Sequence, residues 1–370
     1  MSEPKKTPLY DVHQSLGGKM VEFAGFLMPV AYGSIIDEHN AVRERVGVFD
    51  VSHMGQFVVT GTDAREFVNR MITNDCSKLL PGNLQYTVMC REDGTVVDDL
   101  LVYVISEDRI ILVVNAANIE KDYEHLTSRK RKNVEVSDVS EEYALVAVQG
   151  PRTREVIAAC PFFGQVADRL QKLPYYNGIT FYHRGAEVLV SRTGYTGELG
   201  FEVFVPAELA VALWDQIVVA GEDCGLAVIG LGARDTLRFE AAYCLYGHEL
   251  DDHTSPLEAG LSWVVKLKKP SFCGAEALRK EKAKGSKRVL IGLAVSGRNI
   301  ARQGYTVLRD GREVGRVTSG AFAPTLHKSL CMALVDRACS AGDGQFAVWV
   351  RDKEVPAKPT SLPFYKSRAK

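Results

Sequence analysis

The first half of the chain alternates apolar and polar positions in short blocks of two different periods. Between residues 35 and 46, apolar side chains recur every three to four positions, which predicts an amphipathic helix. The blocks that follow predict a strand in GQFVVTG, a helix in TDAREFVNRMI with Asp63 as N-cap, a hairpin of QYTVMC and TVVDDLLVYVI, a strand in RIILVVNA and a helix in NIEKDYEHLTS. Asp93 and Gly94 supply turn residues for the hairpin. This mixture predicts an α+β sheet domain.

A second mixed region extends from about residue 143 to residue 220. It contains a predicted strand in AEVLVSRTG and a predicted helix around ELAVALWDQIVVAG. Beyond it, GARDTLRFEAAYCL predicts another helix, on which Arg234 and Arg238 lie one turn apart.

The pattern changes at RKEKAKGSKR (279–288), which we interpret as a charged linker. After it, short alternating segments are separated by turns at Asp310-Gly311 and Asp343-Gly344. They predict a small C-terminal β-barrel or sandwich.

Composition adds several exclusions to this picture. The 370 residues, 46% apolar and 25% charged, are typical of a soluble globular protein of two or three domains. The net charge of −1 gives no overall attraction to nucleic acid or acidic membranes, and no stretch has the apolar length of a membrane helix. Eight cysteines without a CxxC pair indicate reduced thiols. Residues 1–13 carry neither a signal core nor a presequence pattern, so we expect the protein to work where it is made or to have lost a targeting segment.

Two adjacent aspartates, Asp98 and Asp99, stand inside an otherwise apolar strand, VVDDLLVY. Neighbouring strand residues point to opposite faces, so each face carries one carboxylate among apolar side chains. A carboxylate in such surroundings is costly unless a partner compensates it, and the reason for it is either structural or catalytic.

Two further segments each allow two interpretations. RTGYTGELGFEV (192–203) lacks the spacing of a nucleotide-binding loop. It is either a glycine-rich hairpin, or a loop where a ligand approaches the backbone while Tyr195 stacks on it and Glu202 accepts its N–H groups. In GLGARD, either Asp235 and Arg238 form a surface ion pair, or Arg234 presents its planar guanidinium to a ligand carboxylate.

Other polar clusters favour structural roles. YGHELDDHTSPLEAG (246–260) concentrates histidine and acidic residues without the spacing of paired metal ligands, so we expect a turn and a helix cap. Ser52 and His53 are adjacent on a predicted strand and cannot form a catalytic dyad by themselves. Met54 is expected in the core or lining a pocket.

Taken together, these segments resemble one family. KMVEFAGFLMPVAY, GVFDVSHMGQF, YTVMCREDGTVVDDLLVY, VVNAANIEKD, SRTGYTGELGFE, GLGARDTLRFEA, DDHTSPLEAGLSWVVKL, GRVTSGAFAPTL and the terminal PFYK occur in this order. The series is similar to the T-proteins of the glycine cleavage system, the aminomethyltransferases. The segment FEAAYCLYGHELDDHTSP departs from the K-G-C-Y-x-G-Q-E pattern of relatives that serve iron–sulfur assembly.

The resemblance implies an α+β fold of three domains in a cloverleaf around a central folate site. The first domain would be discontinuous, with residues 1–55 and parts of 142–170 and 223–278. Residues 56–141 with 171–222 would form a ferredoxin-like folate-binding domain, and residues 286–370 a C-terminal β-barrel of jelly-roll-like type.

The resemblance also implies the site residues. Asp99 would be the catalytic aspartate, Glu202 would hold the pterin N–H groups, and Arg234 would contact the folate. The remaining folate and pocket residues would be Tyr86, Tyr175, Tyr195, Met54, Tyr103, Asn115, Trp263 and Tyr365.

The implied reaction moves an aminomethyl group from the lipoyl arm of the H-protein to tetrahydrofolate, a co-substrate, and needs no metal. Cationic character develops at the one-carbon unit, and a poorly solvated carboxylate stabilises it. The expected partners are lipoylated H-protein and other glycine cleavage components, with no nucleic acid and no membrane. The family works in the mitochondrial matrix in eukaryotes and in the cytoplasm in bacteria. Two alternatives are a folate-coupled demethylase subunit and a non-catalytic folate-binding scaffold.

Overall fold

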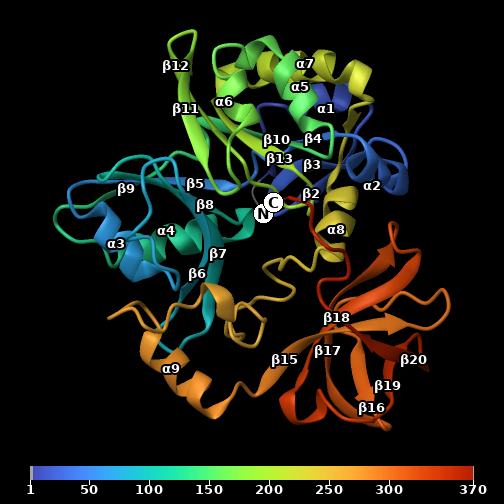
Figure 1. Cartoon of the computed structure of the whole chain (residues 1–370). Helices are drawn as coiled ribbons and strands as arrows, with labels where there is room; N and C mark the ends of the chain where they lie inside the picture. Colours follow the sequence, from blue (N-terminus) through green and yellow to red (C-terminus); the bar gives the residue numbers. More distant parts are fainter. Residues whose placement is uncertain (1–2, 370) are drawn as a thin grey trace.

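The computed structural model describes residues 3–369 and contains three sheet-based parts around a shared centre (Figure 1). A three-stranded sheet of order β1-β3-β2 lies near the start of the chain. Its strands are β1 (Lys5–Lys6), β2 (Lys19–Phe23) and β3 (Phe26–Ala31), and the helices that flank it are α1 (Tyr10–Ser15) and α2 (Ile35–Glu44). Helix α2 agrees with the predicted helix and begins at Ser34, whose side chain accepts a hydrogen bond from the Asp37 N–H.

A six-stranded sheet of order β11-β12-β13-β10-β4-β14 forms the upper part in Figure 1. Its strands are β4 (Gly47–Asp50), β10 (Tyr143–Gln149), β11 (Gly178–His183), β12 (Ala186–Ser191), β13 (Gly200–Pro206) and β14 (Ala227–Val228). Its helices are α5 (Thr153–Ala159), α6 (Ala167–Gln171) and α7 (Ala210–Gly221). Buried aliphatic and aromatic side chains from these elements form one core, with Trp214 of α7 inside it.

This sheet corrects the predicted domain assignment. Residues 171–222 were grouped with 56–141, but β11, β12 and β13 pair with one another and β13 pairs with β10. The sequence could not reveal this, because both sheets consist of similar apolar strands and their hydrogen-bond partners are far apart along the chain.

A five-stranded antiparallel sheet of order β6-β7-β8-β5-β9 carries the aspartate pair. Its strands are β5 (Gly55–Thr60), β6 (Leu84–Cys90), β7 (Val96–Val104), β8 (Arg109–Val114) and β9 (Glu135–Asp138), with helices α3 (Ala64–Met71) and α4 (Ile119–Thr127). The order β7-β8-β5-β9 matches a ferredoxin-like sheet, to which β6 adds an edge strand. Asp63 precedes α3 as predicted, but its side chain does not cap the helix and instead accepts a hydrogen bond from Asn133.

The C-terminal part is a closed barrel of order β15-β18-β17-β16-β19-β20, as the alternating pattern predicts. Its strands are β15 (Arg288–Val295), β16 (Thr306–Arg309), β17 (Arg312–Ala323), β18 (Lys328–Asp336), β19 (Phe346–Val350) and β20 (Lys353–Thr360). Asp310 and Gly311 both have positive φ, which is the conformation of a tight hairpin turn.

One continuous segment, residues 229–287, leads from the upper part to the barrel. Helix α8 (Leu231–Glu240) lies at the centre, between the upper sheet and the barrel (Figure 1). Residues 244–278 pack against β6 and β7, where Val88 and Val96 share a core with Leu257 and Leu278. The predicted linker at 279–288 is wrong for its first half, because α9 (Ala275–Lys284) continues through it. Alanine, glutamate, lysine and arginine all favour helix. The prediction of a linker rested on the high charge of the segment, which a solvent-exposed helix also has.

Candidate functional site

Strand β7 presents its two aspartates to different surroundings. Asp98 pairs with Met89 of β6 in the sheet register and is completely buried. Asp99 pairs with Val88 and is partly exposed. The next residues on the face of Asp99, Leu101 and Tyr103, pack in the core between the two large sheets. Asp99 therefore faces the centre of the molecule.

Amide groups compensate the buried carboxylate of Asp98. Its Oδ2 accepts a hydrogen bond from the Asn115 backbone N–H at 2.9 Å. Its Oδ1 accepts from the Asn115 side chain at 2.8 Å and from Asn118 at 2.6 Å. Of the two reasons considered for an aspartate in an apolar strand, Asp98 therefore has the structural one.

Asp99 has two neutral donors. Tyr86 Oη donates to its Oδ2 at 2.8 Å, and Asn115 Nδ2 donates to its Oδ1 at 3.0 Å. Burial and the negative charge of Asp98 raise the pKa of Asp99 to about 7, although both hydrogen bonds act to lower it. Asp99 therefore exchanges its proton near neutral pH, which suits a group that stabilises a cation or moves a proton.

Aromatic rings stand on one side of Asp99. The Trp263 ring stacks on Tyr86 with centroids 5.7 Å apart and planes at 22°. Trp263 is 57% exposed, so one of its faces is available to a ligand.

The glycine-rich loop 192–199 connects β12 to β13 and brings Tyr195 to α8. The Arg234 guanidinium carbon lies 4.7 Å from the Tyr195 ring centroid, and Tyr243 stacks on the same tyrosine at 5.8 Å. Tyr195 Oη donates to the Cys244 carbonyl oxygen. The hydroxyl group is therefore engaged by the protein, and the ring is the part that remains for stacking.

Glu202 on β13 is buried and accepts a hydrogen bond from Thr193 Oγ1. Burial raises the pKa of Glu202, while Thr193 and the positive charge of Arg234 act to lower it. Arg234 and Glu202 therefore offer one cationic and one acceptor group in the same neighbourhood, which suits a flat polar ring with both N–H and carbonyl groups.

Three other predicted residues line the same region. Tyr103 is buried, and its ring meets Phe204 edge-on at 5.1 Å. Met54 packs against the core that includes Tyr103. The Tyr175 ring lies 4.5 Å from that of Tyr176. Burial raises the pKa of Tyr175, and the charge of Glu202 makes a small addition.

Electrostatic effects join these residues into one site. Burial raises the pKa of both Tyr86 and Tyr195, and the charge of Asp99 adds to both effects, while the charge of Arg234 acts on both Tyr195 and Glu202. Tyr365 is different: its hydroxyl donates to Glu198 at 2.7 Å, and its ring lies 3.9 Å from the Arg43 guanidinium carbon. Through Glu198, Tyr365 contacts the glycine-rich loop.

Sequence reasoning missed Asn118 and Tyr243. The spacing of Asn115 and Asn118 directly after a strand could have indicated the first, because residues three apart in a helical turn lie on one side. Nothing in the sequence indicated that Tyr243 stacks on Tyr195.

The clusters judged structural have structural partners. Glu249 accepts hydrogen bonds from Arg238 at 2.9 Å and from Thr318 at 2.6 Å. Within residues 3–369, no group of three histidine, cysteine or acidic side chains could hold a metal ion. Ser52 accepts a hydrogen bond from the Leu145 N–H and does not bond to His53. No helix of the described part is long and apolar enough to cross a membrane.

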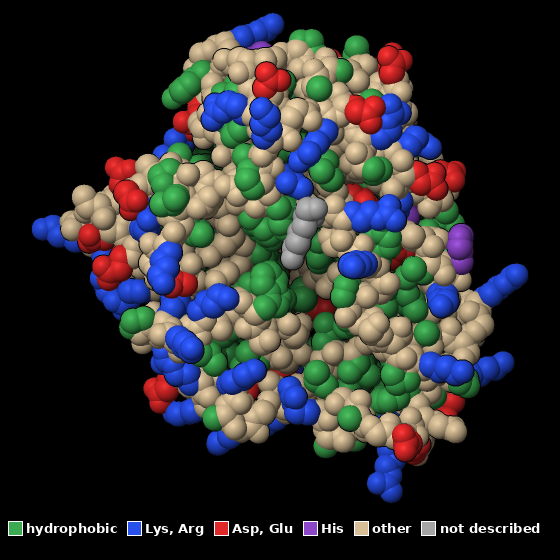
Figure 2. All heavy atoms as spheres, in the orientation of Figure 1, with side chains coloured by type: hydrophobic (Ala, Val, Ile, Leu, Met, Phe, Trp, Pro, Cys, Tyr) green, Lys and Arg blue, Asp and Glu red, His purple; other side chains and the backbone are tan. Residues whose placement is uncertain are grey.

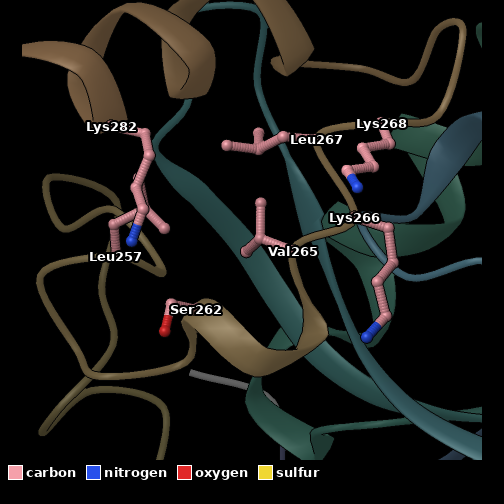
Figure 3. Close-up of a pocket in the computed structure, with 7 residues that line it drawn as sticks. All are labelled: Leu257, Ser262, Val265, Lys266, Leu267, Lys268 and Lys282. Carbon is pink, nitrogen blue, oxygen red and sulfur yellow. The ribbon is translucent and has the colours of Figure 1, made fainter.

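A separate cavity of about 310 Å³ lies beside α9 (Figure 3). It is lined by Leu257, Ser262, Val265, Lys266, Leu267, Lys268 and Lys282. None of the predicted site residues lines it. On the face shown in Figure 2, charges of both signs are spread over the edges and apolar side chains gather at the centre.

Comparisons with known proteins identify the family of the chain. Residues 9–269 match the family model described as the GCVT N-terminal domain, and residues 288–366 match the glycine cleavage T-protein C-terminal barrel domain. An aminomethyltransferase of Thermotoga neapolitana is 52% identical over 98% of both chains, and one of Symbiobacterium thermophilum is 48% identical over 98% of both. The crystal structure of glycine cleavage system aminomethyltransferase T from Bartonella henselae has a TM-score of 0.90 at 32% identity, covering 98% of this chain and 99% of the other.

An α+β fold with a closed C-terminal barrel, and a carboxylate with a raised pKa beside aromatic rings, suit a group-transfer enzyme. The fold and the identity over nearly the whole chain narrow this class further. The chain belongs to the glycine cleavage T-protein family, the aminomethyltransferases of the glycine cleavage system. The resemblance drawn from the sequence motifs is confirmed.

Proposed function

We propose that this chain transfers the aminomethyl group from the lipoyl arm of H-protein to tetrahydrofolate. The products are 5,10-methylenetetrahydrofolate, ammonia and dihydrolipoyl H-protein. Asp99 carries the proposal: it faces the centre, its pKa is about 7, and neutral donors hold it in place. Membership of the T-protein family supports the choice of substrates.

In the proposed reaction, cationic character develops on the one-carbon unit as its bond to the carrier breaks. The ionised form of Asp99 stabilises this charge, and the low polarity of its surroundings strengthens the interaction. Because its pKa is about 7, Asp99 also accepts the proton that the attacking folate nitrogen releases. Tyr86 and Asn115 hold the carboxylate in one orientation.

The folate assignment rests on the second half of the site. Tyr195, Tyr175 and Trp263 offer ring surfaces, while Glu202 accepts pterin N–H groups and Arg234 contacts the folate. Tyr103, Met54 and Asn115 complete the wall of this proposed site. We assign Tyr365 a supporting role through Glu198.

Ammonia release from aminomethylated H-protein, measured with and without tetrahydrofolate, tests the proposal. We expect release that tetrahydrofolate accelerates strongly. Binding of tetrahydrofolate without ammonia release would instead indicate a folate-binding scaffold. Activity that appears only with a flavoprotein partner would indicate a demethylase subunit.

The relatives that share about half of the sequence are bacterial. We propose the bacterial cytoplasm as the working compartment, with lipoylated H-protein and the other glycine cleavage components as partners.

A further inference from the structure

Asp122 lies on α4, behind the aspartate pair, and is completely buried. Neither of its carboxyl oxygens receives a hydrogen bond from an N–H or O–H donor within residues 3–369. Burial, the negative charge of Asp98 and a side-chain hydrogen bond to Asp98 raise the pKa of Asp122. An ionised carboxylate here would be unsolvated and next to a second negative charge, and two such groups do not both ionise.

The donors around Asp98 decide which of the two acids holds the proton. Asp98 accepts three hydrogen bonds from Asn115 and Asn118, whereas Asp122 accepts none from the described residues. Hydrogen bonds from N–H groups stabilise the charged form of a carboxylate. A carboxylate offers about four lone-pair sites, so one site on Asp98 remains for an O–H donor.

We infer that Asp122 is a protonated acid whose O–H donates to Asp98, and that it thereby keeps the negative charge on Asp98 and sets the ionisation of Asp99. Asp122 does not touch the reacting atoms in this scheme and is a positioning residue. Its assignment as a protonated donor is independent of the proposed function, whereas its effect on rate rests on that function.

The other charges near Asp122 agree with this assignment. Asp98 and Asp99 on β7 both raise the pKa of Asp122, in addition to burial, and Lys121 on α4 lowers it. Lys121 directs its ammonium group elsewhere, to Tyr246 Oη at 2.6 Å and Asp252 at 3.4 Å. The net result is a pKa well above the usual range of an aspartate.

A first test needs no substrate. Infrared difference spectra between wild type and Asp122→Asn are recorded at about pH 9, where Asp99, with a pKa of about 7, is ionised. We expect wild type to show the carbonyl stretch of a buried protonated carboxyl group and the variant to lack it. Glu124→Gln, which removes an exposed carboxylate from the same helix, must keep the band. If Asp122→Asn keeps the same band, Asp122 is not the protonated acid.

A second test follows the rate of ammonia release against pH. In Asp122→Asn, the amide N–H replaces the acid O–H. We therefore expect the limb of the pH–rate profile that reports the pKa of Asp99 to stay at its wild-type position. In Asp122→Leu, the O–H donor that keeps the negative charge on Asp98 is lost. The repulsion on Asp99 then falls, and we expect the limb to move toward lower pH by about one unit.

Two outcomes of the rate measurement would overturn the inference. If Asp122→Asn moves the limb to lower pH, Asp122 carries a charge in the native protein. If Asp122→Leu folds and leaves the limb unchanged, Asp122 does not act on Asp99. If Asp122→Leu does not fold, Asp98→Asn replaces it: we expect its limb to move to lower pH, and an unmoved limb contradicts the coupling.

Discussion

At the scale of single residues, the site depends on the different surroundings of two neighbouring carboxylates. Asp98 has three amide donors and no exposure, while Asp99 has two neutral donors and faces the centre. Burial raises the pKa of Asp99, and the negative charge of Asp98 adds to this effect, so that the pKa is about 7. The structural aspartate therefore acts on the ionisation of the aspartate that we propose as catalytic.

Replacing Asp99 by Asn removes the charge and keeps the shape. We expect kcat for ammonia release to fall on the order of 100-fold or more, the usual effect of removing a group that stabilises transition-state charge. Single-turnover kinetics with aminomethylated H-protein would measure it. A variant with nearly normal kcat would show that Asp99 is not the catalytic group.

The same substitution should stabilise the fold at alkaline pH. The pKa of Asp99 is raised in the folded state, to about 7 from 3.8, so its contribution to stability is present below the unfolded value and is lost as pH rises to about 7. We expect Asp99→Asn to melt at a higher temperature than wild type at about pH 9, with a smaller difference at about pH 4. Thermal unfolding at both pH values checks this sign, and a variant that is less stable at the higher pH would contradict it.

Tyr86→Phe removes a donor to the ionised form of Asp99 and leaves the ring that stacks on Trp263. Because this hydrogen bond lowers the pKa of Asp99, its loss should raise that pKa, by about one unit. The limb of the pH–rate profile would move toward higher pH. An unchanged limb would mean that the Tyr86 hydroxyl does not act on Asp99.

At the scale of elements, local pattern predicted more than pairing did. The β6–β7 hairpin follows from alternation and the Asp93-Gly94 turn, and its register places Tyr86 diagonally beside Asp99. The partners of β11–β13 could not be predicted, since the sequence of an apolar strand does not indicate with which other strand it pairs. Glu202 and Arg234 were predicted from their motifs and from family resemblance, but their meeting depends on how the upper sheet packs on α8.

The glycines of the glycine-rich loop have a structural reason that differs from the ligand contact predicted for this segment. Gly194 and Gly200 are needed because of Gln149, whose buried side chain fills the space that a Cβ would occupy. Gln149 donates to the Thr193 carbonyl at 3.0 Å and accepts from Thr196 at 2.9 Å, so it holds the loop at two points.

Gly200→Ala would place a Cβ 2.2 Å from Gln149 Nε2. We expect a loss of about 1–3 kcal/mol in the free energy of unfolding, because Gln149 must leave its hydrogen bonds. Denaturant unfolding would measure it. Gly33→Ala, where no atom lies within 4 Å of the added Cβ, is the matched control and should be nearly neutral. A similar cost for the two variants would contradict this account.

At the scale of the whole molecule, one buried ion cluster connects the separate parts. Arg43 of α2 bonds to Glu198 of the glycine-rich loop and to Glu240 of α8, each at 3.0 Å. Glu240 also accepts the Thr325 N–H, from the barrel, at 2.9 Å. The cluster therefore connects α2, the glycine-rich loop, α8 and the barrel.

Arg43→Met would leave Glu198 and Glu240 buried without their cation. Removing one partner of a buried pair typically costs about 3–5 kcal/mol, and we expect this loss in denaturant unfolding. Arg152→Met, which breaks the exposed pair with Glu155, is the control and should cost about 0–1 kcal/mol. Equal effects of the two substitutions would show that the cluster does not hold the parts together.

The segment that backs the glycine-rich loop has a consequence for biosynthesis. Arg368 N–H donates to the Gly197 carbonyl at 2.6 Å, and Ser367 Oγ donates to the same oxygen across 170 positions of sequence. At typical translation speeds the ribosome needs about 10–30 s to synthesise the residues between the loop and Ser367. During this time the loop has been made, but the C-terminal residues that bind it have not. Nascent chains that have been synthesised only to the end of the barrel would thus contain all the sheets, but their glycine-rich loop would lack its C-terminal hydrogen bonds. We expect chaperones to bind such chains.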